Sequence, residues 1–178
     1  MLEGSDVSEG SFKSVIPLKE INNGGAGSIW TLKGHPNFVL KLYHDTVDLS
    51  QYEKKIEAMI HNKPEMPPLK FNNKIYHQIS WPICSVFKNK KFVGYVMPRI
   101  NPKQYVTLGR FLHRKSRSID KLSESLQSRF KIAYNLSTIV ARIHNQGHMI
   151  VDLKPKNCSV HRDLLFISIF DSDGFFIK

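Results

Sequence analysis

The sequence predicts an α+β fold, with an antiparallel sheet and one helix in the first half of the chain and a small helical part after it. Two patterns support this prediction. Strand-like runs of β-branched and aromatic residues fill most of the first hundred residues and are interrupted by one helical segment. Later, apolar residues recur at spacings of three and four from Leu126 to Ile143, as in a long amphipathic helix. With 178 residues, of which 41% are hydrophobic, the chain can bury the core of one compact unit with two small lobes.

The net charge of the chain indicates anionic partners without choosing among them. The net charge is +11, from 26 Lys and Arg against 15 Asp and Glu, and such a field attracts nucleotides, nucleic acids, acidic lipids or acidic proteins. The densest basic clusters are Lys88–Lys91 and Arg110–Arg117, which we expect to be solvated faces. No aromatic-interleaved or helix-turn-helix pattern accompanies them, so nucleic acid is not an expected partner. No apolar run has the length of a membrane span.

The N-terminal segment and the two cysteines bear on where the protein is located. Residues Met1 to Ser11 are polar, so we assign residues 1–12 as a flexible N-terminal segment, which would also suit a non-cleaved export signal. Cys84 and Cys158 match neither a zinc spacing nor a disulfide framework, which indicates a reducing compartment.

The first predicted lobe, residues 13–97, opens with a strand-like segment at Ser14–Leu18 and a glycine-rich turn at Ile21–Trp30. Glycine suits a turn where backbone N–H groups approach phosphate oxygens without a Cβ in the way. After a second turn at 34–37, the apolar strand Phe38–Tyr43 is interrupted by Lys41. A lysine inside such a run is costly to bury unless it is paired, although in an edge strand it could extend into water.

A helix is predicted from Ser50 onwards, with Tyr52, Ile56, Met59 and Ile60 on one face. The Ser50-x-x-Glu53 spacing also fits a capping box, which would occupy Glu53 locally.

The remaining elements follow in order. The proline-rich segment Asn62–Leu69 predicts a linker, and Ile79–Phe87 and Phe92–Met97 predict two antiparallel strands joined by a basic turn. A short helix is predicted at Val106–Leu112. The long helix ends before Gly147, and its predicted apolar stripe consists of Leu126, Phe130, Ala133, Leu136, Val140 and Ile143.

Two histidines near the end of that helix, His144 and His148, have the spacing of a metal pair. No nearby Cys or Glu completes a site, which favours core or surface histidines.

The last thirty residues carry the most specific pattern. Asp152-Leu-Lys154-Pro-Lys-Asn157 is followed by the apolar run Leu164–Phe170 and then by Asp171-Ser-Asp-Gly. Asp, Asn, Pro and Gly are common turn residues, so this pattern alone would also fit ordinary turns. The glycine-rich turn, the strand lysine and the helix glutamate occur upstream in the order found in protein kinases. With them, the chain resembles the protein-kinase superfamily.

This resemblance implies a bilobal kinase fold in which residues 98–178 form the hinge and a minimal C-terminal lobe. It implies ATP and Mg²⁺ as cofactors, with Asp152 accepting the proton of the substrate hydroxyl and Lys154 stabilising the transferring phosphoryl group. By the same match Asn157 and Asp171 bind the metal, and Lys41 orients the phosphates while Glu53, or alternatively Glu57, holds it. The nucleotide-binding residues implied are Asn22, Gly24, Gly25, Gly27, Ile29, Lys41, Met97, Arg99 and Ile100.

One branch of the superfamily matches in more detail. The segments M-I-x-N-x-P, W-P and F-V-G-Y-V-M-P resemble the bacterial YegI-like and tellurite-cluster kinases, which makes Met97 the gatekeeper and Pro98–Ile100 the hinge. There are departures from the general kinase pattern. Asn22 replaces the first glycine of the loop, and Ile150 and Val151 replace the His and Arg before the catalytic Asp. Regulation by a phosphorylated activation loop is therefore not expected.

The chain stops seven residues after Asp171, without an activation loop. This predicts either a truncated chain or a minimal kinase similar to the OspG and NleH type of bacterial effector. The second interpretation implies a monomeric Ser/Thr protein kinase that is secreted into the host cytoplasm and phosphorylates a host protein, which also activates it. Otherwise the protein is expected in the bacterial cytoplasm. Two alternatives stay open: a pseudokinase that serves as a binding module, and a small-molecule phosphotransferase of the aminoglycoside-kinase type.

Overall fold

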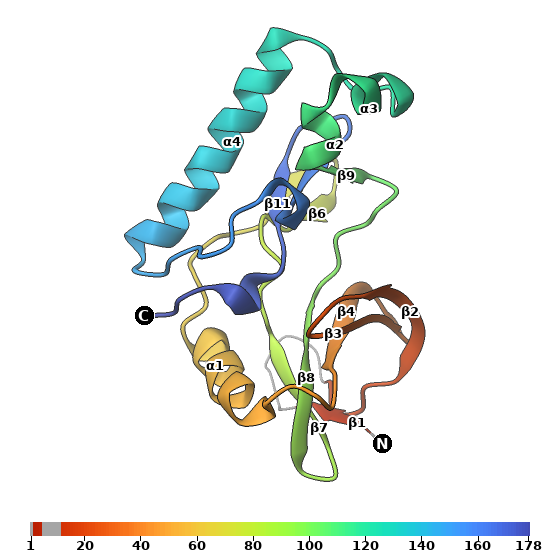
Figure 1. Ribbon diagram of the computed structural model, residues 1–178, viewed down its shortest axis with the longest axis vertical. Coiled ribbons are helices and arrows are strands. Elements are labelled where there is room, and N and C mark those ends of the chain that lie inside the picture. Colours follow the sequence, from red (N-terminus) through yellow and green to blue (C-terminus); the bar gives the residue numbers. More distant parts are fainter. Residues whose placement is uncertain (1, 5–11) are drawn as a thin grey trace. The chain divides into compact units, whose positions relative to one another are not determined.

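The computed structural model describes residues 2–4 and 12–178 (Figure 1). Most of the segment assigned as a flexible N-terminus, residues 5–11, lies outside the described residues. Leu2–Gly4 forms strand β1, which the sequence analysis does not include.

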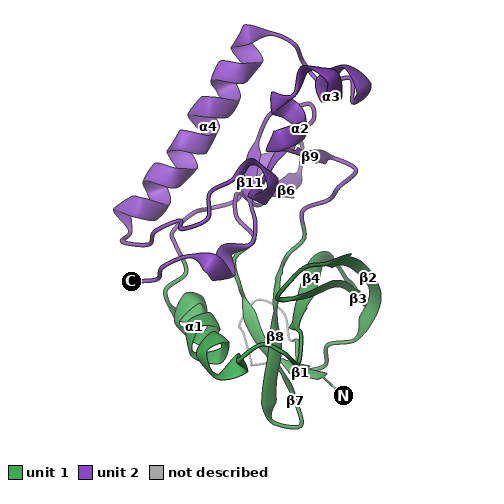
Figure 2. Ribbon diagram, viewed as in Figure 1, with its two compact units in different colours: residues 1–63, 81–99 green, residues 64–80, 100–178 purple. Residues whose placement is uncertain are grey.

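The chain divides into two compact units (Figure 2). The first unit contains Met1–Lys63 and Trp81–Arg99, and the second contains Pro64–Ser80 and Ile100–Lys178. The division does not follow chain order, because residues 64–80 belong with the C-terminal part of the chain rather than with the helix and the strand that flank them in sequence.

The first unit is a six-stranded sheet in which every neighbouring pair is antiparallel, in the order β1-β7-β8-β4-β3-β2. This confirms the predicted antiparallel sheet. Its further strands are β2 (Pro17–Asn23), β3 (Gly27–Leu32), β4 (His35–Tyr43), β7 (Cys84–Lys88) and β8 (Lys91–Pro98). Asn89 and Lys90, the residues of the β7–β8 turn, both have positive φ, as a tight two-residue hairpin requires.

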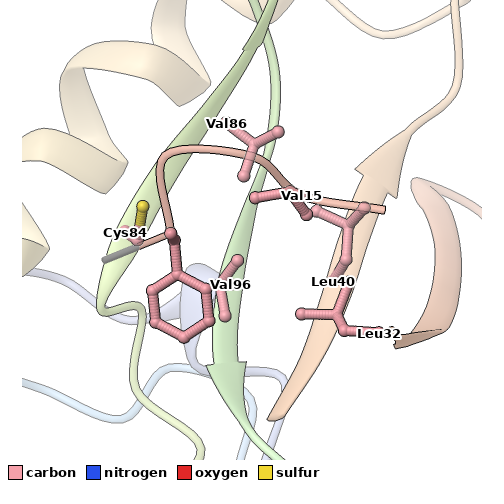
Figure 3. Close-up of a cluster of buried hydrophobic side chains, with 7 residues drawn as sticks. Val15, Leu32, Leu40, Cys84, Val86 and Val96 are labelled. Atoms are coloured by element: carbon pink, nitrogen blue, oxygen red, sulfur yellow. The ribbon is translucent and has the colours of Figure 1, made fainter. Parts of the chain in front are cut away.

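One face of this sheet is covered by a hydrophobic cluster (Figure 3). It consists of the side chains of Phe12, Val15, Leu32, Leu40, Cys84, Val86 and Val96. Because these side chains come from the four inner strands of the sheet, β7, β8, β4 and β3, and from the segment before β2, their burial holds these parts together.

Helix α1 (Leu49–His61) packs against β7 and β8. Ile56 and Met59 are fully buried, and the Trp81 indole N–H donates to the carbonyl of Met59 at 2.7 Å. The N-cap is Asp48, whose carboxylate accepts from the backbone N–H of Ser50. The capping box predicted from Ser50 is therefore wrong, because the helix begins at Leu49 and its N-cap, Asp48, lies two residues before Ser50.

The second unit contains short strands and most of the helices. A three-stranded sheet has the order β11-β10-β9, and β5 and β6 form a separate hairpin. The elements are β5 (Leu69–Phe71), β6 (Lys74–Tyr76), β9 (Tyr105–Thr107), α2 (Leu108–Leu112), α3 (Arg114–Ile119), α4 (Leu126–Asn145), η1 (Pro155–Asn157), β10 (Cys158–His161), β11 (Ile167–Ile169) and η2 (Ser172–Gly174). Among the described residues, no helix has the length and apolar character needed to span a membrane.

Helix α4 confirms the predicted long helix and part of its predicted apolar stripe. Its buried residues are Ile132, Ile139 and Ile143, and it packs against β11. Leu126 and Phe130, which belong to the predicted stripe, are exposed. Ile143 belongs to the predicted stripe and is buried, whereas the buried Ile132 and Ile139 lie outside it, so spacing alone does not fix which side of the helix meets the core.

The basic cluster of α2 and α3 is only partly a solvated face. Arg110 makes a two-pronged ion pair with Asp120, with nitrogen–oxygen distances of 2.6 and 2.9 Å. The guanidinium of Arg117 is buried and donates to the carbonyls of Phe111 and Leu112. Two of the arginines in this cluster therefore stabilise the fold.

Candidate functional site

Lys41 lies in the interior of the first unit's sheet. Strand β4 pairs on one side with β3 and on the other with β8, which places Lys41 opposite Ile29 and Tyr95. The lysine is only 6% exposed, and its ammonium lies 5.6 Å from the ring centre of Tyr43 and 6.0 Å from that of Tyr95. The edge-strand alternative is therefore wrong. A charged group held in such a place at a cost in desolvation is a candidate for function.

Two glycines allow the strands beside Lys41 to approach it. A Cβ at Gly94 would lie 1.9 Å from the carbonyl oxygen of Lys41, and a Cβ at Gly27 would lie 2.2 Å from that of Leu42. Real Cβ atoms do not approach backbone oxygens so closely, so both positions need glycine for packing. Gly27, predicted from the nucleotide-binding motif, thus also has a structural reason to be glycine.

The turn between β2 and β3 is different. Gly24 donates its N–H to the carbonyl of Gly27 at 3.0 Å, and its own carbonyl contacts the His44 ring nitrogen at 3.0 Å. Gly25 has nothing within 4 Å of an added Cβ, and its φ is not positive. Neither packing nor a positive φ explains the glycine at 25, and its predicted role in close approach to a phosphate stays a prediction. Asn22 and Ile29 pair across the base of this hairpin.

The two candidate glutamates of α1 differ in burial. Glu53 is half-buried and precedes the buried Ile56 by three residues, so it lies toward the packed face, whereas Glu57 is exposed. Asp48 provides the cap, so Glu53 is not occupied in capping. In the part of the chain that the structure describes, neither carboxylate forms an ion pair, and the assignment of Glu53 as the partner of Lys41 stays a prediction.

The predicted hinge begins at the end of β8. Met97 is buried and pairs with Val39. The N–H of Arg99 donates to the carbonyl of Asn37 at 2.9 Å, and Pro98 has no N–H. Of the three hinge residues, Ile100 therefore has the N–H that could donate to an adenine base.

In the second unit, Asp152 lies in the loop that follows α4. Its Oδ2 accepts from the ammonium of Lys154 and from the Asn157 amide at 3.2 Å. Among the described residues, no group bonds its Oδ1, and the side chain is half-exposed. The hydrogen bond from Lys154 is the main cause that lowers the pKa of Asp152, so the carboxylate is ionised at neutral pH.

A hairpin links Asn157 to Asp171. Strands β10 and β11 pair with Cys158 opposite Ile169, and the N–H of Phe170 donates to the carbonyl of Asn157 at 3.0 Å. Asp171 follows directly, in the left-handed conformation with φ 63° and ψ 41°. Aspartate tolerates this region better than most residues. The prediction that Asp171 follows a buried strand is confirmed, although that strand is shorter than expected and its partner β10 was not predicted.

The oxygen atoms of this loop fit a hard cation. Asn157 is buried and donates its amide N–H₂ to both the carbonyl and the carboxylate of Asp152, which leaves its Oδ1 for another partner. Carboxylate and amide oxygens suit Mg²⁺, which binds through few protein ligands and keeps several waters. Burial raises the pKa of the adjacent Cys158 thiol to about 11, so it stays protonated and is not a thiolate ligand or nucleophile.

Several serines support the Asp171 turn, and the sequence analysis did not identify them. The buried Ser172 donates its hydroxyl to the carbonyl of Ser80 at 2.8 Å. Ser80 in turn donates its N–H to Ile169 at 2.8 Å, and Ser168 donates its hydroxyl to His77. Residues 77–80 therefore fasten β11 and η2 from a segment about ninety positions away, a separation that local sequence patterns do not reveal.

No family model matches the chain. Two curated proteins do. The chain is similar to the protein kinase YegI of Escherichia coli. It is 22% identical over 166 residues to YegI of strain O157:H7, which is 92% of this chain and 24% of that protein. It is 21% identical over 162 residues to YegI of strain K12, or 90% of this chain and 23% of that protein.

The chain spans about a quarter of the length of these two YegI proteins. The aligned stretch is too long to be confined to either unit, so the similarity to YegI extends over parts of both. It agrees with the resemblance inferred from the motifs.

Proposed function

We propose that the protein is an ATP- and Mg²⁺-dependent protein kinase that transfers the γ-phosphoryl group to a Ser or Thr hydroxyl. The observation that carries this proposal is the set of bonds around Asp152. Lys154 and Asn157 both bind its Oδ2 and leave its Oδ1 open, while a hairpin connects Asn157 to Asp171. The similarity to YegI, a protein kinase by name, supports the same reaction class.

In the proposed mechanism, the residues of the second unit act on the acceptor hydroxyl and on the metal. The open Oδ1 of Asp152 accepts a hydrogen bond from the hydroxyl, aims its oxygen at the γ-phosphorus, and takes the proton as the new phosphate ester forms. Lys154, held by Asp152 before the substrate arrives, offers its positive charge to the transferring phosphoryl oxygens. Asn157 through Oδ1 and Asp171 through its carboxylate would hold Mg²⁺, which supplies charge neutralisation and alignment of the phosphates when bound.

The first unit is proposed to bind the nucleotide. Lys41 would contact the α- and β-phosphates, with Glu53 fixing the ammonium, and the Gly24–Gly25 turn would offer backbone N–H groups to the phosphates. Met97 and the backbone of Arg99 and Ile100 would border the base. Such sites gain most of their rate from positioning and charge neutralisation.

The cellular role is also a proposal. We infer a bacterial effector that phosphorylates a eukaryotic host protein, which also activates it, because the motifs resemble minimal effector kinases. The alternatives are a pseudokinase, which binds nucleotide or a partner without transfer, and an aminoglycoside-type phosphotransferase.

The test is transfer of labelled γ-phosphate from Mg-ATP by the purified chain, into itself and into bacterial and eukaryotic lysates. Asp152→Asn and Asp171→Asn are the variants, since Asn keeps the size of both side chains and tolerates the left-handed φ of residue 171. Labelled protein with wild type and not with either variant supports the proposal, and labelling confined to eukaryotic lysate supports the effector role.

Other outcomes favour the alternatives. Thermal stabilisation by Mg-ATP without any transfer would indicate a pseudokinase. Transfer to kanamycin but to no protein would indicate the small-molecule enzyme. Undiminished transfer by Asp171→Asn would contradict the assignment of the metal ligand.

A further inference from the structure

Four large apolar side chains are exposed close to Asp152 in the second unit. Met149 is 53% exposed, Val151 69%, Leu153 44% and Phe176 55%. Together they are called the apolar rim below. Exposed apolar residues that occur singly need no explanation, but a group of them beside a candidate reactive group indicates a binding surface.

The backbone joins these side chains to one another and to Asp152. Met149 and Phe176 exchange two backbone hydrogen bonds, each of 2.9 Å, so their side chains project from a directly opposed pair of residues. Val151 and Leu153 are the immediate chain neighbours of Asp152, with Cα atoms about 3.8 Å from its own. An acceptor whose hydroxyl comes within hydrogen-bonding distance of the open Oδ1 therefore has its flanking groups next to the segment that carries the rim.

The charges near the rim narrow the class of acceptor. Lys154 bonds Asp152 directly, and the positive charge of Lys156 also acts on that carboxylate. A polycationic aminoglycoside would meet these ammonium groups and a chain of net charge +11, and its hydroxyls and amines would gain nothing from the four apolar side chains. A peptide segment with apolar side chains is not repelled by these ammonium groups, and it can bury its side chains against the rim.

We propose that the apolar rim is the substrate-specificity surface of this protein, and that it binds apolar side chains next to the phosphoacceptor in a protein substrate. This inference rests on the proposed kinase function. It predicts that acceptor sites are selected by an apolar neighbour, because burying one aliphatic group against the rim favours one substrate over another by about tenfold or more.

The experiment compares phosphorylation of peptides that share one Ser acceptor and differ in the residues on either side of it, Leu in one set and Ser or Asp in the others. The measured quantity is the ratio of kcat/KM for the Leu-flanked peptide to that for the Ser-flanked peptide. Wild type, Val151→Ser and Phe176→Ser are compared. The native side chains at both positions are exposed, so these substitutions do not put folding at risk. Phe130→Ser is the matched control, since Phe130 is equally exposed but lies roughly 20 Å along α4 from the end that leads to the loop.

The inference is supported if wild type and Phe130→Ser prefer the Leu-flanked peptide by at least about tenfold, and if the ratio falls toward one in both rim variants. Because the readout is a ratio, a general loss of activity in a rim variant does not imitate this result. Transfer by wild type without such a preference, or a preference that both rim variants retain, overturns the inference and leaves the kinase function standing. No transfer to any peptide or lysate protein overturns the kinase function, and the inference with it.

Discussion

Lys41 and the acidic pair Asp152 and Asp171 are held in place by different kinds of structure. Lys41 is an interior residue of a six-stranded sheet, fixed by backbone ladders on both sides. Asp152 is held by side-chain bonds from two neighbours, and Asp171 by a turn that serine hydroxyls fasten. We therefore expect substitutions in the strands packed against Lys41 to disturb folding. Substitutions of the two aspartates should remove the chemistry and leave the fold intact.

The largest effect is expected where the first unit is most tightly packed. Gly94→Ala would bring a Cβ to 1.9 Å from the carbonyl oxygen of Lys41, so β8 and β4 would have to separate. We expect a loss of about 3 kcal/mol or more in the free energy of unfolding, measured by urea denaturation. Nucleotide binding should be lost along with stability.

Gly25→Ala is the matched control, because an added Cβ there meets nothing within 4 Å. Its stability should stay within about 0.5 kcal/mol of wild type. Its affinity for Mg-ATP should fall by about tenfold, since a Cβ would obstruct an N–H bond to a charged phosphate. Unchanged affinity would remove Gly25 from the nucleotide site.

The second unit offers its own contrast between a buried and an exposed side chain of α4. Ile139→Ala removes a fully buried side chain and should cost about 2–5 kcal/mol of stability. Phe130→Ala removes an exposed one and should change stability by no more than about 0.5 kcal/mol. Thermal and urea unfolding of the two variants measure this. Equal losses would mean that Phe130 is covered in solution.

Several elements show where reasoning from the sequence succeeds and where it fails. The interior strand of Lys41, helix α1 and the basic hairpin tip followed from local patterns, because each is formed by residues adjacent in the chain. The buried residues of α4 followed only in part, since Ile143 lies in the predicted stripe but Ile132 and Ile139 do not, and packing against β11 decides which residues are buried. Strand β10 is only four residues long, and residues 64–80 join the second unit through contacts that span about ninety positions. Short strands and distant contacts leave no periodic signal in the chain.

An effect on activity alone is expected at α1. Glu53→Gln removes the charge of a half-buried carboxylate on the packed side of the helix and should lower phosphoryl transfer by about 100-fold if it fixes the Lys41 ammonium. Glu57→Gln, at an exposed position one turn further on, should have little effect. Initial rates at saturating Mg-ATP compare the two variants. The reverse order of effects would make Glu57 the partner of Lys41.

The smallest expected effect is the pH dependence of stability that arises at the turn between β10 and β11, where His161 lies. The buried His161 ring accepts through Nδ1 from the backbone N–H groups of Asp163 and Leu164, and burial lowers its pKa below the usual 6.5, with Lys74 adding to this and Asp163 opposing it. A protonated Nδ1 could no longer accept, so the folded chain resists the proton that the unfolded chain takes up. Stability is therefore fully present above pH 6.5 and declines as the pH falls from there toward the lowered pKa of the folded state.

His161→Asn tests this directly, because an amide oxygen can still accept from the turn but does not titrate near neutral pH. Between pH 7 and pH 5 the free energy of unfolding of wild type should decline more than that of the variant, since both share every other titrating group. Urea denaturation at several pH values gives the two slopes. Parallel slopes would show that protonation of His161 is not linked to unfolding, and that the hairpin holding Asn157 and Asp171 does not depend on the charge state of this ring.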